Sequence, residues 1–265
     1  MNEAIGWVWT AALGMCVGSF LNVVIHRLPA VVLDTDASVW QALWQPRSHC
    51  PHCRHRLSAA HLVPVLSWLV LRGRCAFCRH PIAWHYPAIE LGTAVLWLLC
   101  AAHWGVGPEA GLWAVFGSAL LALAVIDART CLLPDALTQP LLWLGLLASQ
   151  QQWIALPLSE AVAGAVLGYA ALWLVATVFE RLTGKVGMGA GDFKLLAAMG
   201  AWLGPLALLP LVLMASVGGV AVGLVLQRRG PLPWGGYLPF GPFLAMAATV
   251  MMFRGPALLN AMLAA

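Results

Sequence analysis

The sequence predicts an all-α polytopic membrane protein with about eight transmembrane helices and one large loop between the first two. Three observations lead to this prediction. Only 9% of the 265 residues are charged, 62% are hydrophobic, and the mean hydropathy is +0.85. A soluble domain carries about 25% charged residues, so a soluble globular protein is excluded. Uncharged windows of spanning length also follow one another along the chain.

Seven windows contain no Asp, Glu, Lys or Arg. Six of them suit one crossing each, because a spanning helix needs about 20 residues. These six windows are 4–25, 91–108, 110–126, 136–159, 161–179 and 230–253. The seventh window, 195–227, is too long for one helix, and Gly204 followed by Pro205 is a natural breaking point inside it. We expect a short helix, a turn and a full helix there, which makes eight crossings.

The positive charges predict the orientation, because Lys and Arg collect on the cytoplasmic side of a membrane. Seven of the 14 lie between residues 26 and 87. If that loop is cytoplasmic and the crossings alternate, 13 of the 14 lie inside and only Arg254 lies outside. We therefore divide the chain into a first transmembrane helix (1–25), a cytoplasmic loop (26–87) and a transmembrane core (88–265), with the N-terminus outside.

The loop contains two Cys-x-x-Cys pairs, Cys50 with Cys53 and Cys75 with Cys78, separated by 21 residues. Such pairs are typical of a zinc ribbon, because each short turn directs two thiolates at one tetrahedral ion. Two disulfides or a redox pair are the alternative, which the reducing cytoplasm disfavours. The loop has few apolar runs, so we expect metal binding to supply much of its folding free energy. The histidines beside the pairs are interpreted as solvated loop residues.

Two aspartates stand at the ends of predicted helices. Asp127 directly follows the window 110–126, and Asp192 precedes the window 195–227 after a glycine-rich run. The alternation of crossings brings both to the cytoplasmic face. Ionisable groups in membrane helices are candidates for a functional site, and aspartyl proteolysis requires two carboxyls that share one proton.

Other interpretations of these aspartates stay open. Either one could anchor its helix at the interface, or could pair with Arg129 or Lys194 simply to satisfy its charge. Asp135 is interpreted as a helix N-cap, and it is the second candidate for the first catalytic position. Because Asp192 opens a helix and Asp127 ends one, the helix dipoles predict that Asp192 is the ionised partner.

With these features in place, the chain resembles the type IV prepilin peptidases, also called prepilin leader peptidase/N-methyltransferases. They belong to the Gly-x-Gly-Asp class of aspartyl proteases. The matching stretches cover nearly the whole chain: 18–29 (GSFLNVVIHRLP), both cysteine pairs, 86–90 (YPAIE), Asp127 with 132–135 (LLPD), 187–196 (GMGAGDFKLL) and 239–242 (PFGP). One departure is that Arg129 and Thr130 stand where many members carry Asp-His.

The resemblance implies that Asp127 and Asp192 are the catalytic pair, supported by Gly189, Gly191 and Lys194. It implies cleavage of a basic leader from type IV prepilins or type II secretion pseudopilins at the cytoplasmic face of the bacterial inner membrane. S-adenosylmethionine-dependent methylation of the new N-terminus is expected to follow.

The resemblance also implies that the four cysteines bind structural zinc and that Gly73 and Arg74 are associated with methyl transfer. The expected partners are prepilin substrates and the lipid bilayer, and not nucleic acid. Two alternatives stay open. A proton-coupled transporter would use the aspartate pair to relay protons, and a non-catalytic assembly factor for pili or secretion would tolerate the loss of either carboxyl.

Overall fold

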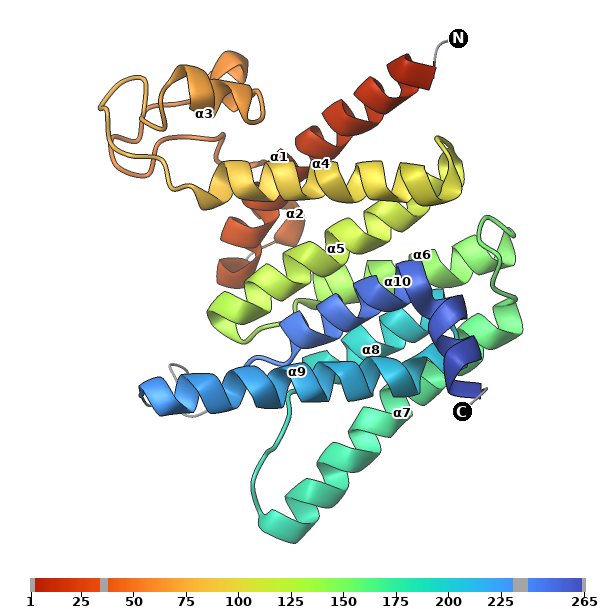
Figure 1. Ribbon diagram of the computed structural model, residues 1–265. Coiled ribbons are helices and arrows are strands. Elements are labelled where there is room, and N and C mark those ends of the chain that lie inside the picture. The colour runs from red at the N-terminus through yellow and green to blue at the C-terminus, as the bar shows by residue number, and fades with distance from the viewer. Residues whose placement is uncertain (1–2, 34–37, 231–237, 264–265) are drawn as a thin grey trace. The chain divides into compact units, whose positions relative to one another are not determined.

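The structure is a computed structural model that describes residues 3–33, 38–230 and 238–263. Among these residues there are helices and turns but no β-strand, which confirms the all-α prediction for the described part (Figure 1). The long helices are α1 (Glu3–Leu33), α4 (His85–Trp104), α5 (Pro108–Thr130), α6 (Asp135–Gln150), α7 (Leu158–Thr183), α8 (Ala190–Leu203), α9 (Leu208–Arg229) and α10 (Gly241–Leu263). The short elements are α2 (Val39–Trp44), α3 (Leu66–Val70) and the 3-10 turns Ala59–Leu62 and Pro205–Ala207.

Each predicted crossing overlaps one of these long helices, although several bounds differ: α6 ends at Gln150 within the window 136–159, and α10 begins at Gly241 within the window 230–253. The predicted break is present, because α8 ends at Leu203 and Gly204 adopts a φ of +78° before Pro205 starts a 3-10 turn. The first helix runs to Leu33, eight residues past its predicted end. The window 230–253 includes residues 231–237, which lie outside the described part, and α10 begins after them.

Among the residues that the structure describes, five helices are long and apolar enough to cross a membrane. They are Glu3–Leu33, His85–Trp104, Pro108–Thr130, Leu158–Thr183 and Pro205–Arg228. The chain is therefore a multi-pass membrane protein, whereas the number of eight crossings stays a prediction. The three-part division into helix, loop and core also stays a prediction.

The chain folds into two compact units, Met1–Ser118 and Ala119–Ala265. In the first unit α1 packs against α4. A Cβ atom on Gly14 would lie 2.8 Å from the Cα of Ala94, and one on Gly18 would lie 2.7 Å from the Cα of Glu90. These glycines, four residues apart, let the two backbones touch, as small residues commonly do between membrane helices.

In the second unit α8 packs against α6, α7, α9 and α10. The contact with α7 is the tightest, because the backbones of Gly164 and Gly200 touch directly. On the side of α6, the Nε1 of Trp202 donates a hydrogen bond to the carbonyl of Leu141 at 2.8 Å, and Gly145 leaves room for the indole ring. Helix α8 is thereby fixed on two sides, and its first turn carries Asp192.

Candidate active site and metal centre

The two aspartates predicted from the sequence come together in the second unit. Asp127 lies in the last turn of α5 and is 4% exposed, and Asp192 lies in the first turn of α8 and is 9% exposed. Their carboxyl groups are close enough to interact electrostatically. Burial and the charges of Asp127 and Asp192 raise the pKa of the Cys131 thiol, so both aspartates are near enough to act on this position as well. Two buried carboxyls from separate helices are therefore close enough for their charges to interact.

Asp127 has a hydrogen-bond donor that the sequence did not reveal. Its Oδ2 accepts a hydrogen bond from the backbone N–H of Gly241 at 2.9 Å, and Gly241 is the first residue of α10. A Cβ atom on Gly241 would lie 2.7 Å from this oxygen, so only glycine allows the approach. The next residue, Pro242, has no N–H to donate. A glycine before a proline is typical of a helix start, but nothing in the sequence connects this pattern with Asp127.

Two glycines at the start of α8, Gly189 and Gly191, have different neighbours. A Cβ atom on Gly191 would lie 2.8 Å from the Cβ of Leu133, so glycine is needed where α8 approaches the connection between α5 and α6. At Gly189 the nearest atom to such a Cβ is Oδ2 of Asp192, at 4.0 Å. Space is therefore open beside this carboxyl. Within the described part of the chain, Oδ1 of Asp192 is buried and has no hydrogen-bond partner.

The dipole argument made from the sequence does not separate the two aspartates. That argument expected only the carboxyl of Asp192 to lie at a helix N-terminus, where the partial charge is positive. The structure places the N-terminus of α10 against Asp127 as well, through the N–H of Gly241. The carboxyl of Asp127 therefore also contacts a helix N-terminus, although its residue stands in the last turn of α5, and the dipole of α10 favours its negative charge.

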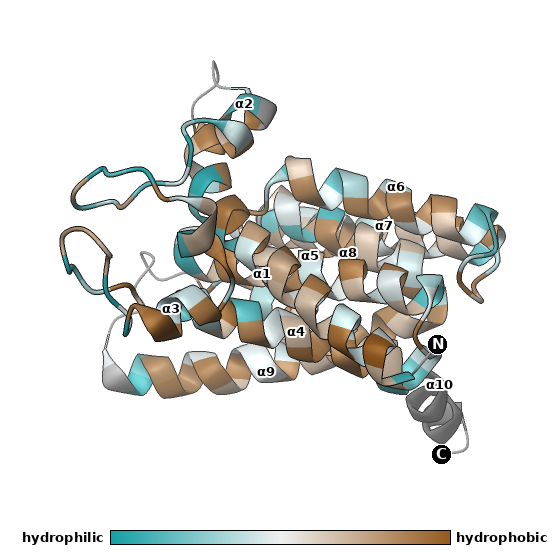
Figure 2. Cartoon of the chain, turned by 90° about the horizontal axis from the view of Figure 1, so that it is seen from above, coloured by the Kyte–Doolittle hydropathy of each residue, from teal (hydrophilic) through white to brown (hydrophobic). Residues whose placement is uncertain are grey.

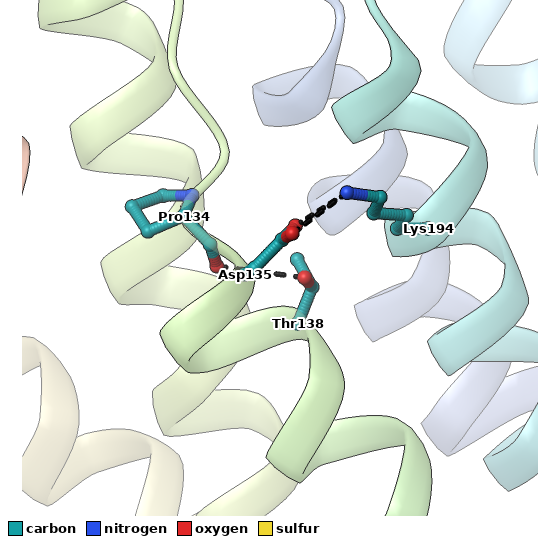
Figure 3. Close-up of polar contacts among 4 residues, drawn as sticks. All are labelled: Pro134, Asp135, Thr138 and Lys194. Atoms are coloured by element: carbon teal, nitrogen blue, oxygen red, sulfur yellow. Dashed lines mark hydrogen bonds and ion pairs between the residues drawn. The ribbon is translucent and has the colours of Figure 1, made fainter. Parts of the chain in front are cut away.

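Lys194 does not pair with either buried aspartate. Its Nζ donates hydrogen bonds to both carboxylate oxygens of Asp135, at 2.8 and 2.7 Å (Figure 3). Asp135 is the first residue of α6 and Pro134 is its N-cap, so the N-cap prediction for Asp135 is wrong. The side chain of Asp135 is exposed and that of Lys194 is partly exposed, and an ion pair at such a surface contributes about 1 kcal/mol or less. The pair holds the starts of α6 and α8 together and leaves Asp192 without this cation.

The four predicted cysteine ligands form a cluster in the first unit. Their sulfur atoms all lie within 4.8 Å of one another, and the Sγ atoms of Cys50 and Cys78 are 3.8 Å apart. A tetrahedral zinc ion with Zn–S bonds of about 2.3 Å requires S···S distances of about 3.8 Å. The four residues therefore fit a zinc ion, and this separation is far longer than the roughly 2.05 Å of a disulfide bond.

The two cysteine turns have the same backbone design. In the first, the N–H of Cys50 donates to the carbonyl of His55 and the N–H of Arg54 donates to the carbonyl of Cys50. In the second, the N–H of Cys75 donates to the carbonyl of His80, and the N–H of Arg79 donates to the carbonyl of Cys75. The arginine after each pair has a positive φ, 56° at residue 54 and 58° at residue 79. This repeated turn directs both thiols of each pair to the same point.

The histidines beside these turns take other contacts. The rings of His52 and His80 stack at 4.5 Å, and the ring of His55 lies 3.5 Å from that of Phe77. No described histidine belongs to the cluster of potential metal ligands. This arrangement agrees with their interpretation as residues that do not bind the metal.

Gly73 has a structural reason to be glycine. Its φ is +67°, its N–H donates to the carbonyl of Trp68 at 2.8 Å, and a Cβ atom on it would lie 2.9 Å from the Trp68 ring. The side chain of Arg74 is exposed. The turn geometry therefore explains Gly73 without reference to methyl transfer, and the association of both residues with that reaction stays a prediction.

Comparison with known proteins places the chain in a family. The profile of the type IV leader peptidase family matches residues 114–224, and that of the bacterial peptidase A24 N-terminal domain matches residues 12–104. A protein from Burkholderia pseudomallei (strain 1026b) is 46% identical over 261 residues, which cover 92% of this chain and 84% of the relative. Proteins from Stutzerimonas stutzeri and Pseudomonas aeruginosa are 44% and 42% identical, over 92% and 93% of this chain and 89% of each relative. No solved structure matches the chain.

All three relatives carry the name prepilin leader peptidase/N-methyltransferase. The two matched ranges contain both buried aspartates and all four clustered cysteines. The chain belongs to the type IV leader peptidase family.

Proposed function

We propose that this chain removes the leader from type IV prepilins and pseudopilins and then methylates the new N-terminus, with Asp127 and Asp192 as its catalytic pair. The observation that carries the catalytic assignment is the meeting of two buried carboxyls from α5 and α8 in one region. The names of the relatives support both activities. They give no support to a proton-coupled transporter or a non-catalytic assembly factor.

The proposed chemistry is general acid–base hydrolysis. One carboxylate removes a proton from a water molecule, whose oxygen attacks the scissile carbonyl carbon, while the other carboxyl hydrogen-bonds to the carbonyl oxygen. The C–N bond then breaks, and the amine leaves with a proton from a carboxyl. The N–H of Gly241 fixes the Oδ2 of Asp127 during these steps. The open space beside Gly189 allows an extended peptide to approach Asp192.

We place this site at the cytoplasmic surface of the inner membrane, with the N-terminus outside. The distribution of Lys and Arg supports this orientation. Both aspartates stand at helix ends, although their side chains are buried. A prepilin with an apolar helix in the bilayer would present a leader bond at that level.

Cleavage and methylation are tested together by mass spectrometry of a model prepilin incubated with the purified protein in detergent, with and without S-adenosylmethionine. We expect leader loss under both conditions and a one-methyl increase only with the donor. Arg74→Ala is expected to reduce the methyl increase and to leave leader loss intact. An intact prepilin under both conditions would contradict the proposed function.

The methyl-transfer site rests on family resemblance alone. S-adenosylmethionine would supply an electrophilic methyl group to the new N-terminal amine. The described residues form no β-strand on which a βαβ cofactor site could be built, so no step through this cofactor is derived. Gly73 and Arg74 stay the proposed residues because they lie beside the metal cluster in the loop.

We further propose that the cysteine cluster binds one structural zinc ion. Cys75→Ser is expected to remove zinc from the purified protein and to make the loop sensitive to proteolysis, because metal binding stabilises such small elements. Cys16→Ser is the matched control, since Cys16 is an exposed cysteine of α1 outside the cluster. Elemental analysis should find one zinc per chain in the wild type and the control. A full zinc content in Cys75→Ser would exclude this residue as a ligand.

A further inference from the structure

One segment of the loop is as apolar as a membrane helix. Residues 62–71 (LVPVLSWLVL) carry no charge and include α3. Several of their large apolar side chains are exposed: Leu62, Val63, Leu66, Leu69 and Val70, by 42%, 41%, 59%, 56% and 80%. Figure 2 shows α3 in the colours of hydrophobic residues. A contiguous exposed apolar patch marks an interaction site, and an uncharged run of about ten residues suits an interfacial or re-entrant segment.

The start of this segment is attached to α4 at the residue that precedes its uncharged window 91–108. The backbone N–H of Val65 donates a hydrogen bond to Oε2 of Glu90 at 2.7 Å, and Glu90 is 8% exposed. Glu90 lies five residues after His85, the first residue of α4, or about 7.5 Å along the helix. The segment therefore lies alongside α4 and not beyond its end.

The segment also contacts α1 well inside its apolar window. Leu62 and Pro64 line a hollow of about 300 Å³ together with Ser19 and Phe20 of α1. Ser19 lies six residues inside the end of the uncharged window 4–25. Along a helix, six residues correspond to a distance of about 9 Å. The contact with α1 thus places Leu62 and Pro64 beside the predicted crossing 4–25, and the contact with α4 places Val65 at the edge of the predicted crossing 91–108.

The charges around the segment complement the surface of an anionic membrane. Exposed arginines precede and follow it: Arg54, Arg56, Arg72, Arg74 and Arg79. The stretch 38–89 contains no Asp or Glu. Basic side chains next to a membrane are attracted to anionic lipid headgroups. Trp84 at the start of α4 is 75% exposed, which is typical of the interfacial aromatic belt.

We propose that residues 62–71 dip into the bilayer, with the side chains of α3 among the acyl chains and the side chains of Arg72 and Arg74, which directly follow the segment, at the lipid phosphates. Trp68 joins the segment to the second cysteine turn, because its Nε1 donates to the carbonyl of Ile82 and its ring covers Gly73. The metal cluster is therefore held at the membrane surface and does not extend freely into the cytoplasm.

The depth of single residues tests this proposal in the full-length protein. A keto amino acid at position 70 accepts a nitroxide label without using the native cysteines. The labelled protein is placed in nanodiscs of phosphatidylethanolamine and phosphatidylglycerol, and the accessibility of the label to oxygen and to a water-soluble nickel chelate is measured. The matched controls are Arg54, exposed beside the metal cluster, and Val217, exposed on the apolar helix α9.

We expect the ratio of oxygen to nickel accessibility at position 70 to resemble that at position 217 and to exceed that at position 54 several-fold. A ratio as low as that at position 54 would show that α3 lies in water. Low accessibility to both reagents would show that protein covers α3. Either result overturns the proposal. A label at Leu66, on the same short helix, provides a second reading in case the one at position 70 disturbs the fold.

Discussion

Replacing either Asp127 or Asp192 with asparagine is expected to lower the rate of leader cleavage by about 10³-fold. A positioned acid or base contributes about 10²- to 10⁴-fold to such a reaction, and each carboxyl serves in proton transfer. The amide keeps the size of the side chain, so the packing of α5 and α8 should survive. The measurement is single-turnover cleavage of a model prepilin, read by mass spectrometry.

Asp135→Asn is the matched control for these two variants. Asp135 lies close in sequence to Asp127, but its carboxylate is exposed and is bonded to Lys194. We expect cleavage by this variant to stay within about threefold of the wild type, since an exposed pair contributes about 1 kcal/mol or less. Methylation of a substrate without its leader should persist in all three variants. Near-normal cleavage by Asp192→Asn would remove Asp192 from the catalytic pair.

Gly241→Ala is expected to lower kcat for cleavage by about 10²-fold with little change in KM. The added methyl group would lie 2.7 Å from Oδ2 of Asp127, so the carboxyl must move and lose the N–H donor of residue 241. A hydrogen bond to a charged group contributes about 1.5–3 kcal/mol, and small displacements of catalytic groups also lower the rate. Steady-state kinetics over a range of prepilin concentrations separates kcat from KM.

Gly255→Ala provides the control within the same helix. A Cβ atom at Gly255 would meet only the end of the Met251 side chain, at 3.6 Å, which is ordinary van der Waals contact. We expect this variant to cleave like the wild type. If Gly241→Ala also kept its kcat, the contact between α10 and Asp127 would have no part in catalysis. A rise in KM alone would instead indicate that Gly241 contacts the substrate.

The sequence predicted those features that depend on neighbouring residues. Uncharged windows predicted the long helices, because the energetic cost of a charge in lipid is a local property. The break at Gly204 followed from glycine and proline chemistry, and the structure shows it there. The cysteine cluster followed from the spacing of two short turns. The meeting of Asp127 and Asp192 was expected from topology and from family resemblance.

Features that join distant parts of the chain escaped prediction. Gly241 lies 114 residues after Asp127, and Lys194 lies 59 residues after Asp135. No local pattern indicates such a pair, since each depends on how whole helices pack. Asp135, which the sequence suggests as an N-cap, is instead the first residue of α6 and forms an ion pair with Lys194. The apolar run 62–71 was visible in the sequence, but its meaning depended on the contact between Val65 and Glu90.

The short length of α8 has a consequence for the path of water to Asp192. Its 14 residues rise about 21 Å, whereas the hydrocarbon layer is about 30 Å thick, so α8 alone cannot join the two surfaces of the bilayer. Residues 195–202 are buried, and α6, α7, α9 and α10 pack around the helix, so protein and not lipid surrounds it. Water must therefore reach the carboxyl of Asp192 between helices of the bundle, and not through a thinned bilayer.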